Sequence, residues 1–268
     1  MLAIIGGTGL TRLSTLAVAH REVIRTPYGE PSAALVVGEL AGRRAMFLAR
    51  HGHGHTIPPH RVNYRANLWA LKQQGATAVL AVASVGAIRG AGPGDLVLPH
   101  QLIDYTWGRA QTFFDGNGSQ VVHADFTRPY SDELRAVCLA AARDSGIPVA
   151  DGGVYGAVSG PRLETAAEID RMDRDGATLV GMTGMPEAGL ARELGLDYAS
   201  VCVVVNHAAG RGDSATQVSL EGIARVLETA MDKVRSLLEH VIVRLPIQPS
   251  GTGREDAPDP VPDGGVQR

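Results

Sequence analysis

Short runs of apolar, often β-branched residues alternate along the chain with segments of helical periodicity. This alternation is typical of an α/β domain, whereas other classes separate their strands from their helices. The apolar runs predict strands at residues 2–6, 34–40, 45–49, 77–82, 95–98, 154–159, 178–182 and 198–205. The pattern therefore predicts an α/β fold.

Helices are predicted between these runs. The clearest is the last, where apolar residues recur at steps of three and four: Leu220, Ile223, Leu227, Met231, Val234, Leu238 and Val241. Two earlier helices are expected over residues 61–74 and 132–145, because each is followed by a glycine that accepts the left-handed conformation. Thr165 and Glu168 form the pattern of a capping box at the start of another helix.

Composition and charge narrow the classes of function. The 268 residues carry a formal net charge of -3, which leaves no basic surplus for a nucleic-acid backbone or an anionic membrane. Cys138 and Cys202 show no CxxC spacing and are expected to be buried free thiols. With no signal segment or long apolar stretch, we expect a cytoplasmic protein without membrane spans. One domain over residues 1–245 and a flexible tail over 246–268 are predicted, because the tail is rich in Pro, Gly and Asp.

Three segments that follow strands have the residues of an anion site. Residues 6–9 read Gly-Gly-Thr-Gly, so backbone N–H groups and the Thr8 hydroxyl can face an anion, although a purely structural glycine turn explains them equally. Ser84 lies in a second such bend, where a buried strand that ends in a turn is the alternative. Thr183 stands between a strand and a helix start, which favours negative charge but is equally the place of a plain helix cap.

A fourth segment, residues 50–55, reads Arg-His-Gly-His-Gly-His, and His60 follows closely. Three alternate histidines invite a metal site, but no nearby Asp, Glu or Cys completes a familiar ligand set and Arg50 would repel a cation. An arginine that can hold two oxygens at once suits a phosphate better. We therefore expect no metal and an oxyanion ligand.

These segments together resemble the trimeric purine nucleoside phosphorylase and methylthioadenosine phosphorylase family, and within it the bacterial S-methyl-5'-thioinosine phosphorylases. The resemblance is carried, in order, by IIGGTGL, RHGHGHTIPPHRVNYRAN, TFFDG, GPRLETAAEI, GMTGMPEA and VVVNHAAG. It implies a single-domain three-layer α/β/α fold with a central mixed, partly barrel-like sheet, and a homotrimer. It also implies a pentosyltransferase of purine salvage that needs no cofactor and uses inorganic phosphate as co-substrate.

The resemblance assigns one group of residues to phosphate: Thr8, Arg50, His51, Ala83 through its backbone, Ser84 and Thr183, with His55 nearby. Ala83 departs from relatives, which commonly carry Thr or Asn there, so one side-chain hydrogen bond is expected to be missing. Met182 matches the methionine expected beneath the sugar, where an apolar surface packs against the ribose.

A second group is expected at the purine. Where relatives that act on 6-aminopurines carry Asp-x-Asp, this chain reads Asn206-His207-Ala208. An asparagine amide offers a donor for O6 and an acceptor for a protonated N7, and the carboxylate of Glu164 accepts the N1–H of a 6-oxopurine. Taken singly, Asn206 reads as a strand-end cap and Glu164 as a helix-start residue; their joint placement in the resemblance makes both catalytic candidates.

His123, Leu220 and the region around Ile223 match positions that line the 5' pocket in relatives, with His123 expected to come from a neighbouring subunit. An apolar lining favours a methylthio group over a hydroxyl. The expected reaction is phosphorolysis of S-methyl-5'-thioinosine to hypoxanthine and S-methyl-5-thioribose 1-phosphate. Inosine, guanosine and S-methyl-5'-thioadenosine remain alternative substrates, and a metal-dependent hydrolase built on the histidines or a noncatalytic nucleoside-binding protein remain alternative classes.

Overall fold

A mixed sheet forms the centre of the molecule in the computed structural model, which describes residues 1–116 and 121–246. Its strands are β1 (Leu2–Gly6), β2 (Ala17–Glu22), β3 (Leu35–Leu40), β4 (Arg43–Ala49), β5 (Ala78–Ala87), β6 (Leu96–Leu98), β7 (Gln101–Asp104), β8 (Val149–Asp151), β9 (Val154–Ala157), β10 (Leu179–Gly181) and β11 (Asp197–His207). The α-helices are α1 (Tyr64–Gln73), α2 (Asp132–Ser145), α3 (Ala166–Asp175), α4 (Gly184–Glu193) and α5 (Leu220–Arg244).

Strand β5 is the branch point of the sheet. It pairs in parallel with β1 and β11 and, near its carboxyl end, antiparallel with β10. One path continues from β1 through β4 and β3 to β2, another from β10 through β9 to β7, and a third from β11 through β6 to β8. Strands from both ends of the described chain thus meet on β5.

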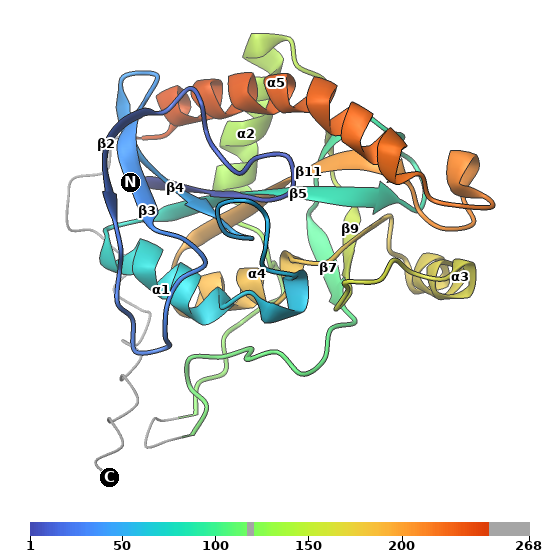
Figure 1. Ribbon diagram of the computed structural model, residues 1–268, viewed down its shortest axis with the longest axis horizontal. Helices are drawn as coiled ribbons and strands as arrows, with labels where there is room; N and C mark the ends of the chain where they lie inside the picture. Colours follow the sequence, from blue (N-terminus) through green and yellow to red (C-terminus); the bar gives the residue numbers. More distant parts are fainter. Residues whose placement is uncertain (117–120, 247–268) are drawn as a thin grey trace.

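Helices cover both faces of this sheet. Figure 1 shows α2 and α5 above the strands and α1 and α4 below them. Along β1, Ala3 and Ile5 pack into the core between the sheet and helices α1 and α4. Leu2 and Ile4 pack into the core between the sheet and helices α2 and α5. Because successive side chains of a strand point to opposite faces, a strand buried on both faces reads as a continuous apolar run. The predicted three-layer α/β/α fold is confirmed.

The elements agree closely with the predicted ones. All eight predicted strands and the predicted helices are present, and Thr165 and Glu168 form the capping box that the sequence indicates. Three strands were not predicted, because β2 is exposed along nearly its whole length and β7 and β8 are short. The prediction of a flexible tail falls mostly on residues 247–268, outside the described residues. In the described part of the chain, no helix is long and apolar enough to cross a membrane.

Candidate functional site

Four parallel strands bring the predicted phosphate segments to one edge of the sheet. β1 pairs in parallel with β4 and β5, and β5 with β11, so their carboxyl ends lie side by side. The segments after β1 and β4 begin at Gly7 and Arg50, and Ser84 and Asn206 lie near the ends of β5 and β11. Ligands of open α/β sheets bind outside these carboxyl ends.

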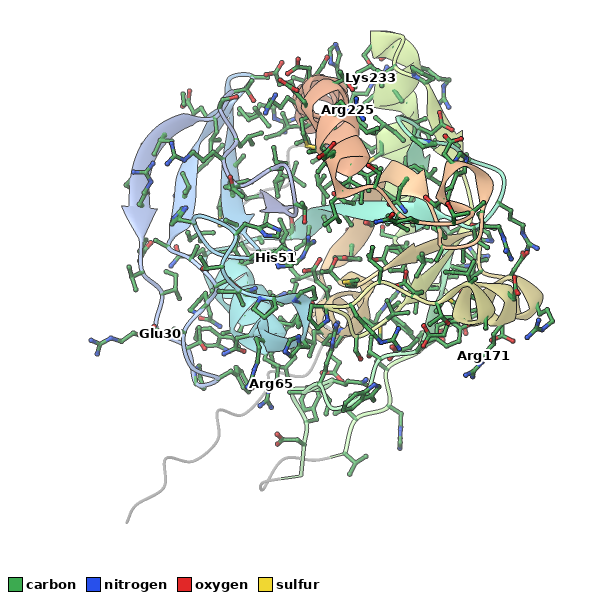
Figure 2. The ribbon with its side chains drawn as sticks, turned by 45° about the vertical axis from the view of Figure 1, so that its right-hand side comes forward. Glu30, His51, Arg65, Arg171, Arg225 and Lys233 are labelled. Atoms are coloured by element: carbon green, nitrogen blue, oxygen red, sulfur yellow. The ribbon has the colours of Figure 1, made fainter. Side chains whose placement is uncertain are left out.

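A cavity of about 630 Å³ lies at this edge. It is lined by nearly all of the predicted site residues: Thr8, Arg50, His51, Ala83, Ser84, Glu164, Met182, Thr183, Asn206 and Leu220. Figure 2 shows His51 in the middle of the molecule, while the other labelled residues lie toward its periphery. The structure thus brings together residues separated by more than two hundred positions in the sequence, and their individual roles remain predictions.

Hydroxyl groups line the cavity near the ends of β1, β5 and β10. The Thr8 hydroxyl lies 2.9 Å from Nε2 of His55, and the Ser84 hydroxyl donates to the Thr8 carbonyl at 3.2 Å. Thr183 precedes α4 but its side chain makes no capping hydrogen bond, so its hydroxyl is not used by the helix. Hydroxyl donors next to a helix N-terminus favour an anionic ligand.

Arg50 is almost fully buried and is held by a carboxylate. Its Nε and Nη2 donate to the two carboxylate oxygens of Glu187 at 2.7 and 2.8 Å, and Nη1 donates to the Val82 carbonyl at 2.9 Å. Burial opposes the charged form of Arg50, but the charge and hydrogen bonds of Glu187 outweigh it and raise the pKa further. Among the described residues, one N–H on each Nη nitrogen has no other partner, and Arg50 lines the cavity.

Gly7 explains how the guanidinium reaches this place. A Cβ atom at Gly7 would lie 2.8 Å from Nη1 of Arg50 and 2.7 Å from the Val82 carbonyl oxygen. Any larger residue would therefore displace the bond between these two groups. The glycine that the sequence suggested for turning the chain is required for close packing around Arg50.

His51 is neutral at pH 7. Its Nδ1 lies 2.8 Å from the Ile57 carbonyl, which can only accept, so Nδ1 carries the proton and donates. Burial, and then the positive charge of Arg50, lower the pKa of His51 to about 4. Nε2 is therefore the acceptor of the ring, suited to a hydroxyl of the ligand such as the P–OH of hydrogen phosphate.

The other end of the cavity carries Asn206 and Glu164. The register between β11 and β5 shifts between Val204 and Asn206, and this bulge turns Asn206 toward the cavity. Its Nδ2 donates to the His207 carbonyl at 2.6 Å, which fixes the plane of the amide and leaves Oδ1 and one N–H for a ligand. Burial raises the pKa of Glu164 above its usual value.

Two predicted substrate residues do not line the cavity. Ala208 is buried behind it, packed with Ile88, Ile169 and Met172. His123 is exposed and lines a different hollow, beside Tyr130. That His123 serves the site of a neighbouring subunit stays a prediction.

The histidine segment does not gather its members. His51 and His55 line the cavity with ring centroids 4.8 Å apart, while His53 and His60 are exposed and lie outside its lining. Across residues 1–116 and 121–246, no three His, Cys, Asp or Glu side chains are placed to hold one metal ion.

Glu187 and Tyr198 were not among the site residues predicted from the sequence. Glu187 is fully buried on the first turn of α4, four residues after Thr183, and accepts a hydrogen bond from Tyr198 at 2.8 Å. The available signal was a carboxylate in the apolar segment GMTGMPEA, since a buried acid needs a partner. Which cation it meets depends on the fold.

Curated relatives cover most of the chain. It is 53% identical over 241 residues to the probable S-methyl-5'-thioinosine phosphorylase of Pseudomonas syringae pv. tomato, which covers 90% of this chain and 97% of that protein. It is 44% identical over 248 residues to the probable 6-oxopurine nucleoside phosphorylase of Moorella thermoacetica, at 92% and 94% coverage.

Solved structures agree with these relatives. Methylthioadenosine phosphorylase from Schistosoma mansoni in complex with adenine superposes with a TM-score of 0.86 at 32% identity, over 90% of each chain. The sequence pattern of the phosphorylase superfamily matches residues 1–243, which span every helix and strand up to the last turn of α5. With its fold, its cavity and its relatives in agreement, the chain belongs to the phosphorylase superfamily.

Proposed function

We propose that the protein catalyses the reversible phosphorolysis of a 6-oxopurine nucleoside, with S-methyl-5'-thioinosine as its substrate. One observation carries the proposal: a single cavity has Thr8, Arg50 and Thr183 in its lining together with Asn206 and Glu164. The first three suit an oxyanion and the last two suit a purine with an oxygen at position 6. The names of the relatives in Pseudomonas and Moorella support the same reaction class.

In the proposed reaction, the C1'–N9 bond breaks and its electron pair goes to the purine. The sugar becomes oxocarbenium-like, and an oxygen of bound phosphate forms the new bond to C1' on the opposite face. Hydrogen phosphate gives up its proton overall and the free purine gains one, so charge and protons balance. No side chain acts as nucleophile, and no metal or organic cofactor takes part.

The protein's part is positioning and electrostatic stabilisation. Arg50, Thr8 and Thr183 hold phosphate below the sugar, and Met182 packs against the ribose. Asn206 receives the protonated N7 through Oδ1 and donates its free N–H to O6. Glu164, as a carboxylate, accepts N1–H, and this contact disfavours adenine because adenine N1 is itself an acceptor.

The 5' group is proposed to be methylthio. Val218, Leu220 and Ile223, at and just before the start of α5, line the same cavity, as do Ile57 and Pro58. These side chains offer no hydrogen bond to a 5'-hydroxyl, so burying that hydroxyl costs free energy that a methylthio group does not lose.

A four-substrate panel tests the proposal. S-methyl-5'-thioinosine, inosine, guanosine and S-methyl-5'-thioadenosine are incubated with and without phosphate, and the released base is quantified. We expect phosphate-dependent release from the 6-oxopurine nucleosides, fastest from S-methyl-5'-thioinosine. Turnover of S-methyl-5'-thioadenosine alone would refute the base assignment, and release that does not depend on phosphate would refute phosphorolysis.

We also propose that the active unit is a homotrimer in which His123 completes the 5' pocket of a neighbour. The position of His123 outside its own cavity supports this arrangement. Light scattering during gel filtration measures the mass, and a monomer that retains full activity would contradict it.

A further inference from the structure

The ion pair behind the phosphate end of the cavity carries an inference about how Arg50 works. Glu187 is completely buried and is not among the residues that line the cavity, whereas Arg50 is. The carboxylate therefore grips the guanidinium from the side away from the ligand. It occupies the edge formed by Nε and Nη2, at 2.7 and 2.8 Å.

This grip fixes the direction of the donors that remain. A guanidinium is planar with five N–H groups in a rigid fork, so holding one edge sets the direction of the others. The Val82 carbonyl takes a third N–H at 2.9 Å. One N–H on Nη1 and one on Nη2 are left, and an anion can be held by both.

The carboxylate is itself fixed from a third direction. Oε1 of Glu187 accepts from the Tyr198 hydroxyl at 2.8 Å as well as from Nη2 of Arg50. Burial, and then the Glu187 charge, raise the pKa of Tyr198 well above its usual value, so this hydroxyl keeps its proton and remains a donor. The hydrogen bonds that join Tyr198 to Glu187 and Glu187 to Arg50 all lie in the buried interior.

The segment that opens α4 also carries a second predicted phosphate residue. Thr183 precedes α4 and Glu187 lies four residues later, with the extended backbone of Met185 between them. Thr183 and Arg50 both line the cavity. One short segment therefore supplies the Thr183 hydroxyl to the cavity and, from behind it, the carboxylate that holds Arg50.

We infer that Glu187 is a positioning residue that, with Tyr198, orients Arg50 for phosphate; the inference rests on the proposed function, in which the cavity binds phosphate. This inference predicts the opposite change in phosphate affinity from the one that charge alone would give. A buried negative charge next to an anion site repels the anion, so removing it should tighten phosphate binding if charge alone mattered. If Glu187 acts by orienting Arg50, removing it weakens phosphate binding instead.

The test measures phosphate binding by calorimetry and the KM values for phosphate and nucleoside separately. Glu187→Gln keeps the shape but loses one acceptor, and we expect the phosphate Kd and KM to rise about tenfold or more with the nucleoside KM little changed. Tyr198→Phe keeps the ion pair and removes one hydrogen bond, with an expected rise of roughly fivefold. It also carries the test if Glu187→Gln does not fold.

Glu193→Gln is the matched control. Glu193 lies on the same helix and accepts two hydrogen bonds, from Thr112 at 2.7 Å and from the Phe113 N–H at 2.8 Å, but does not line the cavity. It should lower thermal stability and leave the phosphate Kd unchanged. An unchanged or lower phosphate Kd in Glu187→Gln, or in Tyr198→Phe if the first variant is unfolded, overturns the inference. Failure of the proposed function is distinct, because the wild type itself would then release no base.

Discussion

The amide of Asn206 offers a sharp test of base recognition, through the substitution Asn206→Asp. In the structure Nδ2 donates to the His207 carbonyl at 2.6 Å and keeps a second N–H, which the proposed function assigns to O6 of the purine. A carboxylate loses both donors and places an oxygen against that carbonyl. A buried polar group left without its partner costs about 1–3 kcal/mol, roughly fivefold to more than a hundredfold in rate.

We therefore expect kcat/KM for S-methyl-5'-thioinosine to fall by about tenfold to a hundredfold. The value for S-methyl-5'-thioadenosine should fall less or rise, because a carboxylate accepts from a 6-amino group. Glu164 still opposes adenine N1, so the variant should not become an efficient adenine-nucleoside enzyme. Steady-state kinetics with both substrates at saturating phosphate give the ratio directly.

Asn67→Asp is the matched control for this experiment. Asn67 is fully buried, whereas Asn206 is partly buried; Asn67 holds the Ser32 backbone and hydroxyl and lies outside the cavity. This variant should lose stability and keep the ratio of the two kcat/KM values. A ratio in Asn206→Asp that stays within about threefold of wild type would refute the assignment of Asn206 to the purine, since one lost hydrogen bond is worth that much.

Three further predictions concern other parts of the molecule. Glu164→Gln should lower kcat/KM for S-methyl-5'-thioinosine by roughly tenfold and reduce discrimination against S-methyl-5'-thioadenosine, because the charged acceptor for N1–H is lost; equal losses on both substrates would contradict this. The pKa of His51 is lowered from 6.5 in the unfolded chain to about 4 in the folded protein, so between these two pH values unfolding takes up a proton. The free energy of unfolding therefore falls as the pH drops from 6.5 to 4, by about 3 kcal/mol in all. Urea unfolding at several pH values measures the loss, and His51→Gln, whose amide can still donate to the Ile57 carbonyl, should flatten the profile; an unchanged profile would show that other groups are responsible. Gly181→Ala should destabilise the fold by a few kcal/mol, about the cost of overpacking, because its Cβ would lie 2.2 Å from the Tyr155 hydroxyl. Thermal denaturation checks this, and Gly92→Ala is the control, because neither glycine has a positive φ and a Cβ at Gly92 would have no atom closer than 3.9 Å.

Much of the fold was readable from the sequence because its signals are local. A helix start such as Thr165 with Glu168, or the Gly146 that ends α2, depends on residues within one turn. Apolar runs such as residues 2–6 mark strands buried on both faces. β2 was not predicted because an exposed edge strand has no such run.

Part of the site was readable as well. Glycine bends and polar residues directly after predicted strands indicated Thr8, Arg50 and Ser84, and the parallel pairing of β1, β4, β5 and β11 explains why such positions meet. The sequence alone left each segment with an ordinary structural alternative. Only their order along the chain, through the family resemblance, joined them into one site.

The tertiary structure decided what no local pattern contains. Arg50 and Glu187 are 137 residues apart, and neither the partner of the arginine nor the side from which it is held follows from the sequence around it. The bulge that turns Asn206 toward the cavity arises from its pairing with β5, about 120 residues earlier in the chain, and the neutral state of His51 arises from burial beside Arg50. Sequence determines elements through neighbours along the chain; orientation and charge state depend on neighbours in space, which exist only once the sheet has formed.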